Sequence, residues 1–148
     1  HRLQPQVETG DKKLLMTVAW LDKQVSNQAS EILARTLSLP SLEGSVMEGL
    51  LGIDDVEGPV DSAMVIYDTG TYDIYDPAQT PFIPPLANQI PSSECDPHGV
   101  RATVPASIDQ LLGFLRPGGR IENFCDGVCD GTIPYEQPPG GPCVLPLP

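Results

Sequence analysis

The stretch KLLMTVAWLD, residues 13–22, decides how the rest of the sequence is interpreted. Its apolar residues run almost without interruption from Leu14 to Leu21 and include β-branched and aromatic members. A run of this length and composition is typical of a strand that is buried on both faces. Such strands occur in parallel sheets whose faces are covered by helices. The stretch therefore predicts a buried parallel strand that carries Asp22 at its carboxyl end.

A helix and a second buried strand follow. Ser26 or Asn27 can cap the helix, because their side chains accept hydrogen bonds from orphan backbone N–H groups, and Pro40 ends it. The second strand is predicted from Ala63 to Tyr67, within the segment SAMVIYDTG. At helical spacing, one face of the helix carries Val25, Ala29, Ile32, Leu33 and Thr36.

The last predicted helix begins at Pro105 and stops at the Pro-Gly-Gly of residues 117–119. Its apolar stripe consists of Ile108, Leu111, Leu112 and Leu115. We treat residues 1–148 as one segment of a single α/β domain. It divides into an acid-bearing strand and helix (13–39), an insertion (41–61), a strand (62–70), a proline-rich loop (71–97), a histidine turn with the last helix (98–117) and a cysteine-rich tail (120–148).

The overall charge restricts the kinds of partner. The sequence has 8 Lys and Arg residues against 20 Asp and Glu residues, a net charge of −12. Nucleic acids and anionic membrane surfaces are bound through Lys and Arg, so this balance argues against both. No membrane span is expected, because the sequence lacks an apolar run of about 18 residues.

The cysteines Cys95, Cys125, Cys129 and Cys143 all lie in loop-like sequence rich in Pro and Gly. We interpret them as two disulfides, which indicates an oxidising compartment and hence a secreted or periplasmic protein. Three pairings are possible, and the sequence does not choose among them. A zinc site is the alternative, although the spacing Cys125-x3-Cys129 is looser than in most zinc knuckles.

The segment SSECDPHGVR, residues 92–101, contains His98, one of only two histidines in the sequence. The predicted order is strand, Asp22, helix, strand, His98, helix. Open α/β sheets place their sites at the carboxyl ends of the strands, so Asp22 and His98 are expected to face one crevice. In a serine hydrolase an acid orients a histidine, which takes the proton of the nucleophile.

Two segments resemble secreted bacterial α/β-hydrolases of the esterase/lipase type. VAWLDKQVSNQASEILARTLSLP, residues 18–40, is similar to the segment around their catalytic acid. DPHGVRATVPASIDQLLGFLRPGGRIENFCDGVCDG, residues 96–131, is similar to their histidine turn and last helix. The resemblance implies that Asp22 is the triad acid and His98 the triad base, with carboxylic esters as substrates and no cofactor.

The sequence departs from this family in three ways. Leu21 stands where the family's turn often has Gly, and the separation between Asp22 and His98 is long for the fold. Above all, no Gly-x-Ser-x-Gly nucleophile elbow occurs; residues 43–47 come closest. Because the fold's order is Ser, acid, His, we expect this to be the C-terminal part of the hydrolase. A tightly bound N-terminal chain would then supply the Ser and the oxyanion hole.

Other interpretations of these residues stay open. Asp96 is a rival acid, although its position two residues before His98 favours a role in shaping the turn. His1 and His98 together could bind copper, but proteins with such a copper brace are all-β. The chain could also be a noncatalytic, disulfide-stapled structural subunit. A calcium site could be formed by the acidic residues Asp54, Asp55, Glu57 and Asp61, whose spacing does not match a twelve-residue calcium loop.

Overall fold

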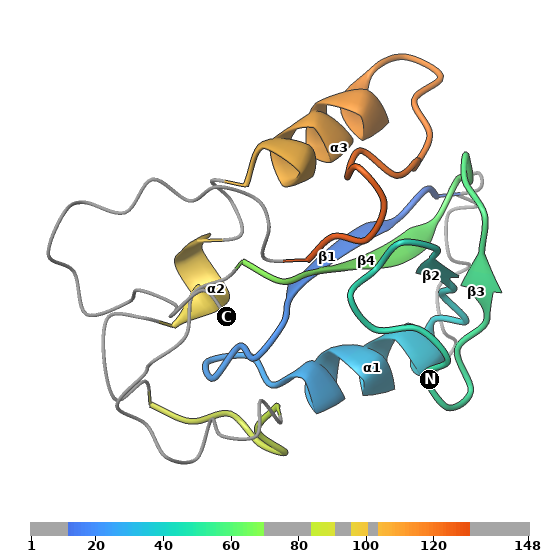
Figure 1. The fold of residues 1–148 in the computed structure, drawn as a ribbon. Helices are drawn as coiled ribbons and strands as arrows, with labels where there is room; N and C mark the ends of the chain where they lie inside the picture. The colour runs from blue at the N-terminus through green and yellow to red at the C-terminus, as the bar shows by residue number, and fades with distance from the viewer. Residues whose placement is uncertain (1–11, 70–83, 91–95, 101–103, 131–148) are drawn as a thin grey trace, which may run out of the picture.

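The computed structural model describes residues 12–69, 84–90, 96–100 and 104–130. These residues form a small parallel sheet of four strands with helices beside it, a generally α/β arrangement (Figure 1). In chain order the elements are β1 (Leu15–Ala19), α1 (Asn27–Thr36), β2 (Ser41–Leu42), β3 (Asp55–Val56), β4 (Ala63–Tyr67), α2 (Pro97–Val100) and α3 (Pro105–Leu115).

The two longest strands lie side by side and are the two that the sequence predicts. Leu15 of β1 pairs with Ala63 of β4, and the parallel register continues to Ala19 and Tyr67. β4 is buried along its whole length, as its unbroken apolar sequence requires. The strand order is β1-β4-β2-β3, so within the described part of the chain β1 is an edge strand.

The insertion at residues 41–61 also contributes to the sheet, which the sequence did not indicate. β2 pairs in parallel with both β4 and β3, through Ser41 with Met64 and through Ser41 and Leu42 with Asp55 and Val56. Each of these two strands has only 2 residues. Two residues are too few to show the alternation by which a strand is recognised in a sequence.

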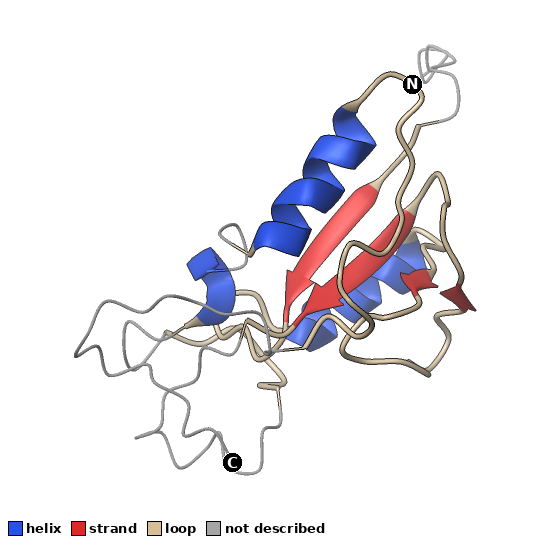
Figure 2. Cartoon of the chain, turned by 45° about the horizontal axis from the view of Figure 1, so that its top comes forward, coloured by secondary structure: helices blue, strands red, loops and turns tan. Residues whose placement is uncertain are grey.

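The core consists of two clusters, one on each face of the sheet. Alternate residues of β4 point to opposite faces, because side chains in a strand have a period of two. Ala63, Val65 and Tyr67 pack with Val104 and Ala106 at the start of α3. On the other face, Met64 and Ile66 of β4 pack with Val18, Ala34, Leu39 and Ile53. The helices α1 and α3 therefore cover opposite faces, as Figure 2 shows.

Both long helices contact the sheet through small or polar residues. The buried residues are Asn27, Ser30 and Ala34 in α1, and Ala106, Ser107 and Gln110 in α3. The apolar stripes predicted from the sequence lie on the outer sides instead. We call the exposed Ile and Leu residues on these sides the outer apolar faces: Ile32, Leu33 and Leu37 at α1, and Ile108, Leu111, Leu112 and Leu115 on α3.

The tail after α3 returns to the sheet. Val60 and Ile121 form an antiparallel bridge. At the carboxyl ends of β2 and β4, Cys129 N donates a hydrogen bond to Gly44 O, and Cys129 O accepts one from Asp68 N. A disulfide joins Cys125 to Cys129. In the described ranges, no helix has both the length and the apolar character needed to cross a bilayer.

Candidate active site

A strained turn at the end of β1 positions the predicted acid. Leu21 is 1% exposed and has a φ of 62°, a left-handed conformation that favours glycine. The buried amide of Asn27 holds the turn from both sides. Its Oδ1 accepts a hydrogen bond from Leu21 N at 2.9 Å, and its Nδ2 donates to Ala19 O at 2.7 Å. Leu21 can therefore occupy the position where glycine was expected.

The turn delivers Asp22 into a nearly closed environment, because its side chain is only 8% exposed. Its Oδ1 accepts hydrogen bonds from Gln24 N and Val25 N, both at 2.9 Å. Its Oδ2 lies 2.8 Å from Nδ1 of His98. The carboxylate thus has partners for both oxygens, as a buried charge requires. Asp22 does not cap the helix; Ser26 does, by accepting a hydrogen bond from Ala29 N at 3.3 Å.

His98 lies in the one-turn helix α2, where the sequence predicted a turn. Figure 1 shows α2 beyond the carboxyl ends of β1 and β4, where the order of elements predicted a site. The side chain of His98 is 44% exposed. Among the described residues, Asp22 is the hydrogen-bond partner of its ring. The ring therefore has Nδ1 bonded to a buried acid, while nearly half of the side chain remains exposed.

This arrangement determines which nitrogen of His98 can act as a base. A carboxylate oxygen only accepts hydrogen bonds, so the proton of the neutral ring belongs on Nδ1. Nε2 then carries the free lone pair of the ring. When Nε2 takes a proton, the negative charge of Asp22 stabilises the imidazolium. The pair has the geometry of a general base with its orienting acid.

Two neighbouring segments hold the loop that carries the acid. Asp96 Oδ1 accepts hydrogen bonds from Lys23 N at 3.2 Å and from His98 N at 3.4 Å. Residues 84–90 lie against the same loop, because Gln89 N donates to Lys23 O at 2.6 Å and Ser26 N donates to Asn88 Oδ1 at 3.0 Å. The sequence indicated a role for Asp96 in the turn but not its bond to Lys23, since no sequence pattern marks a side chain that bonds to a distant backbone group.

The structure separates the other candidate residues from this pair. Cys125 and Cys129 are bonded to each other, so they present no thiolates to zinc. Cys95, Cys143 and His1 lie outside the described residues. In the described ranges, no three His, Cys, Asp or Glu side chains come together as a possible metal site. The acidic residues of the insertion, all of which are described, are likewise not gathered into such a site. Asp55 accepts a hydrogen bond from Gly49 N.

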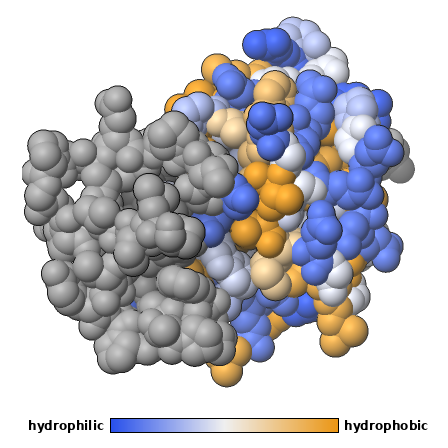
Figure 3. All heavy atoms as spheres, viewed as in Figure 1, coloured by the Kyte–Doolittle hydropathy of each residue, from blue (hydrophilic) through white to orange (hydrophobic). Residues whose placement is uncertain are grey.

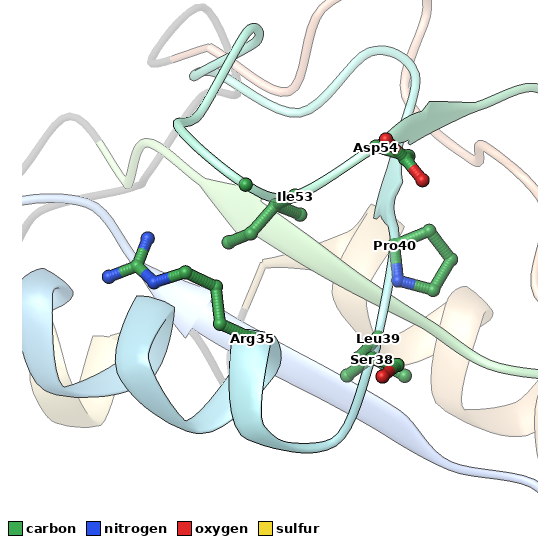
Figure 4. Close-up of a pocket in the computed structure, with 7 residues that line it drawn as sticks. Arg35, Ser38, Leu39, Pro40, Ile53 and Asp54 are labelled. Atoms are coloured by element: carbon green, nitrogen blue, oxygen red, sulfur yellow. The ribbon is translucent and has the colours of Figure 1, made fainter.

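Two hollows in the described surface do not include the pair. A cavity of about 210 Å³ is lined by Arg35, Ser38, Leu39, Pro40, Gly52, Ile53 and Asp54 (Figure 4). It lies where β2 and β3 begin, at the edge of the sheet opposite Asp22 and His98. A wider hollow of about 510 Å³ lies beyond the ends of β2 and β3, and its lining includes Glu43, Glu48, Glu57 and Glu122.

Comparisons with protein-family models, with curated protein sequences and with solved structures found no match for this chain. Any statement about function therefore has to be argued from the Asp22–His98 pair and its surroundings.

Proposed function

We propose that this chain is the C-terminal part of a secreted or periplasmic α/β-hydrolase that cleaves carboxylic esters through an acyl-enzyme. His98 is the general base and Asp22 is the acid that orients it. The nucleophilic Ser and the oxyanion hole lie on an N-terminal partner chain. The observation that carries the proposal is the 2.8 Å contact between His98 Nδ1 and the buried carboxylate of Asp22.

The surroundings of the pair support this assignment. A histidine on a protein surface does not need a carboxylate that is buried and held by two backbone N–H groups. Burying that carboxylate costs desolvation energy, and the arrangement orients the imidazole so that Nε2 can accept a proton. The pair also joins residues 76 positions apart in the chain at the carboxyl ends of two adjacent parallel strands. The resemblance of residues 18–40 and 96–131 to esterases and lipases gives the two residues the same roles.

The absence of a hydrogen-bond partner for Nε2 of His98 among the described residues supports a nucleophile on another chain. Within the described part of the chain, no serine hydroxyl forms a hydrogen bond with the ring. The buried serines Ser41 and Ser45 hydrogen-bond to each other, and Ser45 Oγ also accepts from Ile66 N. These serines are committed to the core of the sheet. A Ser on a partner chain would approach Nε2 from the solvent side.

The outer apolar faces support a large partner on both sides of the sheet. Leu33 is 49% exposed, Leu112 is 52% exposed and Leu115 is 67% exposed. Contiguous exposed apolar surface of this kind marks a site of protein association. β1, the edge strand of the described sheet, runs between the two helices, and a parallel strand added beside it would bring its own carboxyl end next to Asp22. Figure 3 shows apolar atoms at the surface on the face that it displays.

The exposed apolar residues near the pair favour an ester with an apolar acyl group. Leu86 is 77% exposed and Ile90 is 93% exposed, and both belong to the segment that lies against the acid loop. Exposed aliphatic side chains beside a catalytic pair can bury part of a hydrocarbon chain when the substrate binds.

The proposal is tested by replacing each histidine in the purified assembly and measuring hydrolysis of p-nitrophenyl esters. His98→Ala is expected to lower kcat on the order of 10⁴- to 10⁶-fold, because the nucleophile loses its base. His1→Ala is the matched control and is expected to keep the kcat of the wild type. Native mass spectrometry verifies that both variants remain assembled. Ester hydrolysis by His98→Ala at the wild-type rate would refute the catalytic role of His98.

A further inference from the structure

We propose that Asp96 is a positioning residue that sets the Asp22–His98 hydrogen bond by tying the loop that carries Asp22 to the helical turn α2 that carries His98. The proposal rests on the proposed function for its catalytic consequence. Its structural claim concerns this chain alone: without the side-chain oxygen of residue 96 that accepts from Lys23 N, the ring of His98 no longer keeps its proton on Nδ1.

Asp96 forms its hydrogen bonds next to both residues of the pair. Oδ1 accepts from the backbone N–H of Lys23, the residue directly after Asp22, at 3.2 Å. The same oxygen lies 3.4 Å from the backbone N of His98, a long and therefore weak contact. One oxygen thus touches the residue after the acid and the residue that is the base. The bond to Lys23 spans 73 residues of sequence and does most of the tying.

The link between Asp96 and His98 is rigid. Pro97, the only residue between them, is less than 2% exposed and begins α2. Its ring fixes φ, and its burial fixes the position of the segment. A carboxylate attached to Lys23 on one side of this proline therefore determines where the imidazole on the other side points. A shift of about 1 Å in such a group can cost about 10²-fold in rate.

A contribution to the stability of the folded state explains Asp96 poorly. Its second oxygen, Oδ2, is buried and has no hydrogen-bond partner among the described residues. A buried carboxylate oxygen without a partner destabilises the folded state. A side chain without polar oxygens would avoid that cost. The retained carboxylate is accounted for if its Oδ1 is needed to hold the acid loop.

The test reads the tautomer of His98 from long-range ¹H–¹⁵N correlations of ¹⁵N-histidine-labelled protein. In the wild type, the proton is expected on Nδ1. Asp96→Ala is expected to give a mixture of both tautomers and, in the assembled hydrolase, a kcat about 10²-fold lower with little change in KM. Asp96→Asn keeps an oxygen that can accept from Lys23 N, so it is expected to restore the Nδ1 tautomer. Asp22→Ala serves as the positive control for losing it.

The matched control is Asp61→Ala, which removes a carboxylate whose side chain is 61% exposed and which pairs with Lys13 just before β1. It is expected to leave the tautomer unchanged. A folded Asp96→Ala variant that keeps the Nδ1 tautomer would overturn the proposal. If that variant does not fold, Asp96→Asn decides, because a lost Nδ1 tautomer in the folded Asn variant overturns it as well. A failure of the proposed function appears differently, as absent hydrolysis with a normal tautomer in the wild type.

Discussion

At the scale of single residues, the candidate site depends on a backbone conformation that its sequence does not favour. Leu21 adopts the left-handed region, which costs a residue with a Cβ atom roughly 1–2 kcal/mol. The amide of Asn27 offsets this cost with two buried hydrogen bonds: its Oδ1 accepts from Leu21 N, and its Nδ2 donates to Ala19 O. The position of Asp22, one residue later, follows from that compensation.

Asn27→Ala is therefore expected to lower the free energy of unfolding by about 2 kcal/mol or more, because it leaves a buried N–H and a buried C=O without partners. Urea unfolding followed by circular dichroism measures the change. Gln28→Ala, at the exposed neighbouring position of the same helix, is the matched control and is expected to stay within about 0.5 kcal/mol of the wild type. Equal unfolding midpoints for Asn27→Ala and Gln28→Ala would contradict this account of the turn.

The sequence predicted the two residues of the candidate pair but not the residues that hold them. Asp22 and His98 could be found because each occupies a recognisable place, after an apolar strand and in a Pro-His-Gly turn. Asn27 and Asp96 act by hydrogen bonds to backbone groups at Ala19, Leu21 and Lys23. Backbone groups are the same in every residue, so no sequence pattern indicates which side chain will bond to them.

At the scale of elements, predictability follows length and periodicity. β4 has the bounds that the apolar run predicted, from Ala63 to Tyr67, and α3 starts at the predicted Pro105. β1 is shorter than its apolar run, because only Leu15–Ala19 pair with β4. β2, β3 and the helical turn α2 have 2, 2 and 4 residues, which is below the length at which a pattern can be recognised.

The loop closed by the Cys125–Cys129 disulfide helps to tie the tail to the sheet. Cys129 is 1% exposed, and its backbone forms hydrogen bonds at the ends of β2 and β4. Replacing both Cys125 and Cys129 by Ala is expected to lower the free energy of unfolding by about 2 kcal/mol, the value for a small closed loop. Thermal unfolding measures it. Val128→Ala, at a 49% exposed position inside the same loop, is the control and is expected to change little. An unchanged Tm in the double variant would show that the backbone bonds alone fix the tail.

At the scale of the whole molecule, the outer apolar faces are the feature that most needs an explanation. Both long helices turn their apolar stripes away from the sheet that they cover, and the sequence could show the stripes but not their direction. A stripe at helical spacing is normally buried. In the proposed hydrolase these stripes are buried by the partner chain on the two sides of β1.

Leu33→Gln combined with Leu112→Gln tests that explanation. Both positions are about half exposed in this chain, so its own stability is expected to change by less than about 0.5 kcal/mol. The dissociation constant of the complex between this double variant and the partner chain is expected to rise at least about tenfold, since two apolar contacts are lost. Dilution followed by native mass spectrometry gives that constant, with Asp109→Asn on the exposed side of α3 as the control. Unchanged partner affinity would place the partner elsewhere.

In the proposed hydrolase, Asp22 and His98 activate a serine on a second chain, and labelling with a fluorophosphonate, which reacts with activated serines, tests this. The account predicts one labelled Ser in the native assembly, on a chain other than this one. It also predicts that labelling is greatly slowed by His98→Ala and not by His1→Ala. Labelling at the wild-type rate in His98→Ala, or a labelled Ser within this chain, would contradict the account.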